Sequence, residues 1–117
     1  MVVDIVRERR ADSLFHALSD TTRRDIVLRT LTEEQSVSEL ARPYAMSFAA
    51  VQKHVVVLER AGLVTKRRHG REQLVRGNVT SIRTALALLE ELELIWRGRV
   101  DRMHEILSED NSKGAIR

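Results

Sequence analysis

The sequence contains no cysteine, one proline, five glycines and four aromatic residues. Without a thiol, the chain cannot form a disulfide framework, an iron–sulfur cluster, a thiolate metal site or a cysteine nucleophile. With so few aromatic rings, the core is expected to be mainly aliphatic. No apolar stretch approaches the roughly eighteen residues that span a bilayer, and the first ten residues alternate apolar with charged side chains. The sequence therefore predicts a cytoplasmic protein that does not enter membranes.

The length and the charge distribution indicate one globular domain with a basic segment. The chain has 117 residues, of which 43% are apolar and 32% charged, and its net charge is only +3. From Arg60 to Arg76, however, six basic residues stand against one acidic residue, Glu72, which leaves the rest of the chain slightly negative. A local concentration of positive charge favours an acidic partner.

Two helices are predicted in the first third of the chain. An apolar stripe with helical spacing runs from Ala11 to Leu18 and extends back through Val3. Asp20 interrupts the stripe and is a good N-cap for a second helix whose apolar positions run from Ile26 to Leu31. Residues 32–35 are expected to form a polar loop.

The next segment predicts two helices joined by a four-residue turn. Ser36 and Glu39 have the spacing of a capping box, which begins a short third helix. Pro43 should end that helix near Arg42. Ser47 can cap a fourth helix, which Gly62 should end. The expected buried stripe of this fourth helix is Phe48, Val51, Val55 and Leu58.

A hairpin and a long helix are predicted to complete the domain. Between Leu63 and Val75 the apolar period changes to about two, with Gly70 at the turn. From Ile82 to Leu107 one apolar seam persists, which predicts a helix of about 40 Å. We therefore expect a single domain over residues 1–107 and a flexible tail over residues 108–117.

The element order, α-α-α-α-β-β-α, predicts a mostly α winged helix-turn-helix fold in which the small β-hairpin is the wing. Three segments carry a more specific signal: KHVVVLERAGLV (Lys53–Val64), VSELA (Val37–Ala41) and FHALSDTTRR (within Leu14–Arg24). On these segments the chain resembles the ArsR/SmtB family of bacterial repressors over more than half of its length. The glycine and arginine at positions 70 and 71 extend the resemblance into the wing.

The resemblance implies a homodimer, joined through the first and last helices, that places two recognition helices in successive major grooves of a palindromic operator. An independent argument favours a dimer, because a compact monomer of this size cannot cover the apolar seam of so long a helix. Repression follows from the resemblance alone, and DNA binding is equally consistent with activation. The expected interface residues are Leu14, Leu89, Leu92, Trp96, Val100 and Met103.

The fourth helix is the expected recognition helix. Gln52 can pair with adenine, Lys53 can reach a phosphate or a guanine, and the methyl groups of Ala49 and Ala50 can contact thymine.

Two polar residues of this helix have two interpretations each. Ser47 either binds a phosphate or only caps the helix. His54 matches a histidine of the family and either contacts DNA or forms a hydrogen bond within the domain.

Arg67, Arg68 and Arg71 of the wing are expected to bind the minor groove or its phosphates. The chain departs from the family pattern at two positions. Val56 stands where relatives often have lysine or arginine, and Gly77 stands where they usually have a larger apolar residue.

No metal, cofactor or enzyme activity is expected. Asp101, His104 and Glu105 lie within one helical turn, but no second histidine follows to complete a tetrahedral set, and His16 is the only further candidate nearby. No phosphate-binding G-x-x-x-x-G-K loop and no G-x-S-x-G nucleophile motif is present. An unknown effector ligand is left open.

The alternative interpretation is a winged helix that contacts only proteins. Ala49, Ala50, Val56 and Val57 favour it slightly, because they make the recognition face apolar. The basic wing favours double-stranded DNA more strongly.

Overall fold

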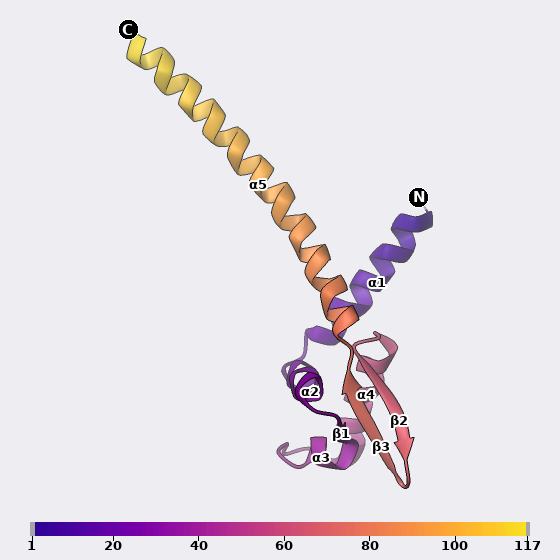
Figure 1. The fold of residues 1–117 in the computed structure, drawn as a ribbon. Helices are drawn as coiled ribbons and strands as arrows, with labels where there is room; N and C mark the ends of the chain where they lie inside the picture. Colours follow the sequence, from indigo (N-terminus) through magenta and orange to yellow (C-terminus); the bar gives the residue numbers. More distant parts are fainter. Residues whose placement is uncertain (1, 117) are drawn as a thin grey trace. The chain divides into compact units, whose positions relative to one another are not determined.

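The structure is a computed structural model that describes the backbone of residues 2–116 and the side chains of residues 7–110 (Figure 1). It divides into two compact units, residues 1–85 and residues 86–117. Within the described range the elements are α1 (Val2–Leu18), α2 (Thr21–Thr32), β1 (Gln35–Ser36), α3 (Val37–Ala41), α4 (Phe48–Arg60), β2 (Val64–His69), β3 (Glu72–Gly77) and α5 (Val79–Ile116).

Side-chain hydrogen bonds stabilise the junction between α1 and α2. The carboxylate of Asp20 accepts a hydrogen bond from the backbone N–H of Arg23 at 3.0 Å, which confirms Asp20 as the N-cap of α2. This bond holds the pKa of Asp20 below its ordinary value. The Arg23 guanidinium donates to the carbonyls of Ala17, at 2.7 Å, and His16, at 3.1 Å. It thereby satisfies the Ala17 carbonyl at the end of α1 and adds to the two bonds that the His16 carbonyl accepts from Ser19.

The start of α3 differs from the prediction in two ways. The Ser36 hydroxyl accepts from the Glu39 backbone N–H at 3.1 Å, as expected for a cap, but it also donates to the Glu39 carboxylate. The loop expected over residues 32–35 is also shorter than predicted, because Thr32 ends α2 and Gln35 begins β1. A two-residue strand is too short to show a period of two, and it forms only because β3 supplies its partners, Leu74 and Val75.

The fourth helix begins and ends as predicted, but its first residue is not buried. Ser47 accepts from the Ala50 N–H at 3.1 Å, and Gly62 adopts φ +77° after the helix. Phe48, expected in the buried stripe, is 50% exposed. It occupies the first turn of α4, whereas Val51, Val55 and Leu58 further along the helix are buried.

The three-stranded antiparallel sheet has the order β1-β3-β2, and Gly70 turns the β2–β3 hairpin with φ +62°. Figure 1 shows the hairpin extending beyond β1 as a two-stranded wing. The core of the unit comprises Leu14, Ala17, Ile26, Val27, Val37, Leu40, Val51, Val55, Leu58, Leu63, Val64, Val75 and Ala85.

A steric constraint explains why position 77 is a glycine. A Cβ at Gly77 would lie 2.8 Å from the backbone nitrogen of Leu31 and 2.8 Å from its side chain. The end of α2 therefore approaches β3 too closely for any side chain at this position. This contact explains why a small residue ends the wing where the family usually has a larger one.

Gly77→Ala should lower the free energy of unfolding by about 1–3 kcal/mol, because part of the clash is with backbone that cannot rotate away. Urea denaturation followed by circular dichroism measures the change. Gly98→Ala is the matched control, since a Cβ there meets no atom within 4 Å in the described structure. Alanine is the better helix former, so this control should be neutral or stabilising. A Gly77→Ala protein as stable as the parent would show that the backbone of α2 moves freely.

The last helix continues past the predicted end at Leu107 and reaches Ile116. Helical backbone thus includes most of the segment expected to be a flexible tail, while the domain boundary at residue 107 stays a prediction. Leu89, Leu92, Trp96 and Met103 are exposed, with Trp96 at 60%. No helix in the described range is long and apolar enough to cross a membrane.

Leu14 is a correction to the expected dimer interface. Its side chain is 0% exposed within the unit of residues 1–85, so it has no surface left to bury against a second copy. Leu14 was predicted from its helical spacing, and that spacing marks the inward face of α1 rather than an outer face.

Candidate nucleic-acid interface

An arginine of α2 organises the helix-turn-helix. The Arg29 guanidinium donates to the carbonyls of Leu40, at 2.9 Å, and Glu39, at 3.1 Å, and to the side-chain oxygen of Gln35, at 2.9 Å. It also lies over the ring of Tyr44, 5.6 Å from the ring centre. One charged group thus joins α2, β1, α3 and the turn before α4.

The turn itself is anchored by Tyr44. Its hydroxyl donates a hydrogen bond to the carboxylate of Asp25 on α2. Partial burial, together with this acceptor, raises the pKa of Tyr44 above its ordinary value. A phenol is protonated at neutral pH in any case, so the Tyr44 hydroxyl can donate and tie the turn before α4 to α2.

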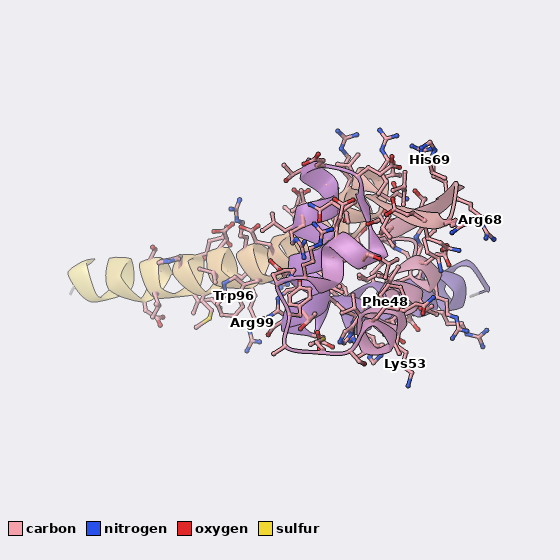
Figure 2. All side chains as sticks on the ribbon, turned by 90° about the horizontal axis from the view of Figure 1, so that it is seen from below. Phe48, Lys53, Arg68, His69, Trp96 and Arg99 are labelled. Atoms are coloured by element: carbon pink, nitrogen blue, oxygen red, sulfur yellow. The ribbon has the colours of Figure 1, made fainter. Side chains whose placement is uncertain are left out.

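The outer face of α4 presents the predicted contact residues. Ala49, Gln52 and Lys53 are exposed, and Ala50 is half-buried. Figure 2 shows Lys53 projecting from α4 away from the domain. With two alanines on this face, the helix backbone can come close to a flat or grooved partner.

The structure places His54 within the domain. Its Nδ1 atom lies 3.3 Å from a guanidinium nitrogen of Arg23, which can only donate. Nδ1 is therefore the acceptor, and the proton of the neutral ring is on Nε2. Of the two interpretations of His54, the internal hydrogen bond is the one observed, and the Nε2–H remains as a donor. For Ser47, the cap is observed and the phosphate contact stays a prediction.

A groove brings the recognition helix and the wing together. It has a volume of about 280 Å³. Gln52 contributes from α4, and Arg68 and Arg71 contribute from the wing, so two predicted elements of the site share one cavity. Figure 2 shows Arg68 projecting from the end of the wing. The complete lining is Ser36, Val37, Ser38, Phe48, Gln52, Arg68, Arg71, Glu72 and Gln73.

The wing arginines fall into two groups. Arg67 forms a two-pronged ion pair with Glu34, with nitrogen–oxygen distances of 3.0 and 2.7 Å. This pair raises the pKa of Arg67 and lowers the pKa of Glu34. Arg68 follows on the opposite side of β2, because successive strand residues alternate, and its guanidinium makes only a long contact of 3.5 Å with the Gly70 carbonyl among the described residues. Arg67 is thus engaged, while Arg68 and Arg71 line the groove.

A second ion pair fixes the wing against the recognition helix. Lys66 on β2 lies 3.3 Å from the carboxylate of Glu59 on α4. Lys66 and Arg68 occupy the same side of β2. The ion pair between Lys66 and Glu59 therefore also fixes the side of the strand from which Arg68 reaches toward Gln52.

Sequence reasoning missed Phe48, Ser38 and Gln73 as groove residues. Phe48 precedes Gln52 by one helical turn, so the spacing that placed Gln52 on the outer face also placed Phe48 beside it. That signal was available. No local signal marks Ser38, Gln73 or the pairing of Glu34 with Arg67, because those contacts depend on tertiary structure.

The described side chains contain no group of three or more histidine or acidic residues arranged to hold a metal ion. The absence of a metal site stays a prediction.

Comparisons with known proteins agree with this geometry. Residues 18–67 match the family model described as "Helix-turn-helix domain". The HTH-type transcriptional regulator Rv2034 of Mycobacterium tuberculosis is 36% identical over 88 residues, which are 75% of this chain and 79% of that protein.

Solved structures show the same similarity. An ArsR-like transcriptional regulator from Rhodococcus sp. RHA1 is 31% identical, with a TM-score of 0.75, over 85% of this chain and 93% of the other. The homodimeric winged helix-turn-helix DNA-binding domain of Mb0332 from Mycobacterium bovis, at 24% identity and a TM-score of 0.61, covers 73% of this chain and 81% of its own. At that identity the likeness is one of fold alone.

Proposed function

This chain belongs to the ArsR-like winged helix-turn-helix transcriptional regulators, and from that membership we propose that it is a homodimeric repressor of a palindromic operator. As a member it is a DNA-binding regulator of transcription and not an enzyme. A regulator of operators acts where the chromosome is, so the cytoplasmic location expected from the sequence is part of the proposal.

The groove shared by α4 and the wing carries the proposal. Gln52 offers an amide that can read the edge of a base, and Arg68 and Arg71 offer charge to the phosphates beside it. Because the three side chains meet in one cavity, a single stretch of duplex can engage all of them. Lys53, exposed on the same helix, adds a positive charge that can reach a phosphate or a guanine.

The exposed apolar residues of α5 support the homodimer. Leu89, Leu92, Trp96 and Met103 are large, and each is more than half exposed in the single chain. Contiguous apolar surface of this kind marks an interface. A two-fold dimer then requires an operator with two-fold symmetry, with half-sites centred about one helical turn, or 10 bp, apart.

Gln52→Ala should weaken operator binding by about 1–3 kcal/mol per half-site, because it removes a base contact without changing the charge. Binding to a scrambled duplex should change little. Fluorescence anisotropy on both duplexes measures the two affinities. Gln73→Ala removes the same amide from the wing side of the groove and tests whether base reading is confined to α4. It should leave the ratio of operator to scrambled affinity unchanged.

Genomic footprinting with the purified protein supplies the operator and tests its symmetry. Two protected half-sites related by a palindrome are expected, and transcription from the same template should fall when protein is added. A single, asymmetric footprint would contradict the homodimeric part of the proposal. A rise in transcription would contradict repression while leaving DNA binding intact.

A further inference from the structure

A second concave site lies between α1 and the C-terminal end of α4. Two adjoining cavities, of about 350 and 240 Å³, share Ser13, Arg60 and Ala61. Both lie wholly within the unit of residues 1–85. Together they form one groove, called here the α1–α4 groove, lined by Arg9, Arg10, Ser13, His16, Val57, Arg60, Ala61 and Gly62.

The charge of the α1–α4 groove is entirely positive. Arg9 and Arg10 line it from α1 and Arg60 lines it from α4, while no acidic residue belongs to the lining. Among the described side chains, none of these three arginines has an ion-pair partner. Glu59, the neighbour of Arg60, is instead paired with Lys66 at 3.3 Å. Like charges held together in a concavity attract an anion strongly, because each adds to the same local potential.

The field of α4 does not supply this attraction. The groove lies at the C-terminal end of α4, where the helix dipole disfavours an anion. The carbonyls of Val57, Leu58 and Glu59 are, however, already satisfied by the N–H groups of residues 61, 63 and 62. The guanidinium groups, each a full charge, therefore dominate the potential.

The donors fit a phosphate better than a carboxylate. A single arginine saturates the two oxygens of a carboxylate, whereas a phosphate monoester has three terminal oxygens and two negative charges to satisfy. The three guanidinium groups and the Ser13 hydroxyl match that need. Val57 and Ala61 form an apolar wall in the part of the groove next to His16. This wall leaves room for an organic group attached to the phosphate.

We propose that the α1–α4 groove binds a small organic phosphate monoester, with its dianion on Arg9, Arg10 and Arg60 and its organic part against Val57 and Ala61. This site is separate from the groove between α4 and the wing. Along α4, Arg60 is eight residues from Gln52, or about 12 Å. The proposal does not depend on the identity of the operator.

The test is a titration of the ¹⁵N-labelled full chain with phenyl phosphate and with inorganic phosphate, at constant ionic strength. Saturable shifts are expected for the backbone amides of Ser13, Ala61 and Gly62, with tighter binding of phenyl phosphate. Arg60→Gln should weaken this binding roughly ten-fold, since it removes a charged hydrogen-bond donor. Val57→Ala should reduce the preference for phenyl phosphate over inorganic phosphate.

Arg83→Gln is the matched control, because Arg83 is an exposed arginine of the same unit that does not line the groove. It should bind phenyl phosphate as the parent does. Equal losses of phenyl phosphate affinity in the Arg60 and Arg83 variants, or amide shifts confined to the wing, would show that the binding is a non-specific effect of charge. Either result would overturn the proposal.

Two further outcomes would also overturn it. If the amide shifts changed when the protein was diluted but not when phenyl phosphate was added, the groove would be part of the contact between two copies of the chain. A loss of affinity for scrambled DNA in Arg60→Gln, of the size found for a wing arginine, would assign it to the DNA interface.

Discussion

Arg68→Ala combined with Arg71→Ala should make the dependence of DNA binding on salt shallower by roughly 3–4 units of log–log slope. The double substitution removes two charges from each subunit and four from a dimer. Each phosphate contact contributes about 0.9 to the slope for B-DNA, because it releases condensed counterions. Affinity should fall on operator and scrambled duplexes alike, since phosphates carry no sequence information. Anisotropy titrations over a salt series measure both slopes.

Arg67→Ala is the matched control for this experiment. It removes the same charge from the same strand, but its guanidinium is held by Glu34 through two hydrogen bonds. Its effect on the slope should therefore be smaller than that of either groove arginine. An unchanged slope in the Arg68 and Arg71 variant would mean that the wing does not touch DNA. A full loss in Arg67→Ala would show that the pair with Glu34 opens on binding.

Leu89→Asp combined with Trp96→Asp should abolish the dimer. Both residues lie on the apolar seam of α5 and are exposed in the single chain, so a partner would have to bury two uncompensated carboxylates in each copy. The expected product is a monomer, or an unfolded chain if folding needs the dimer. Sedimentation velocity gives the mass, and circular dichroism separates the two outcomes.

Leu94→Asp is the control for the seam. Leu94 is as apolar as Leu89 and more exposed, but it lies about 140° away around the helix. Its substitution should leave a folded dimer that binds DNA. If the Leu89 and Trp96 variant also remained a folded dimer, α5 would not be the interface.

The elements that were predictable from sequence are those set by local chemistry. Asp20 and Ser47 cap helices through N–H groups three residues away, and Gly62 ends α4 through its own left-handed conformation. Such signals lie within a few residues of where they act. The bounds of the recognition helix and the hairpin turn followed from them, and the outer position of Gln52 followed from the spacing of the apolar residues of α4.

The features that were not predictable depend on partners distant in the chain. β1 exists because β3 pairs with it, and Arg67 is withdrawn from the groove because Glu34 lies across from it. Phe48 fitted the spacing of the buried stripe, but spacing alone does not bury a side chain, and Phe48 instead lines the groove beside Gln52. The predicted end of α5 at Leu107 was wrong for a different reason. A polar composition and one glycine weaken a helix without ending it.

The ion pair between Glu34 and Arg67 also has a consequence for how the protein finds its target. A genome offers a vast excess of wrong sites, and every cation free to touch phosphates lengthens the time spent on each of them. By occupying one wing arginine internally, Glu34 lowers the charge available for such visits without removing Gln52 from the helix that reads bases. A protein with Glu34→Gln would thus hold random DNA longer and reach its operator more slowly.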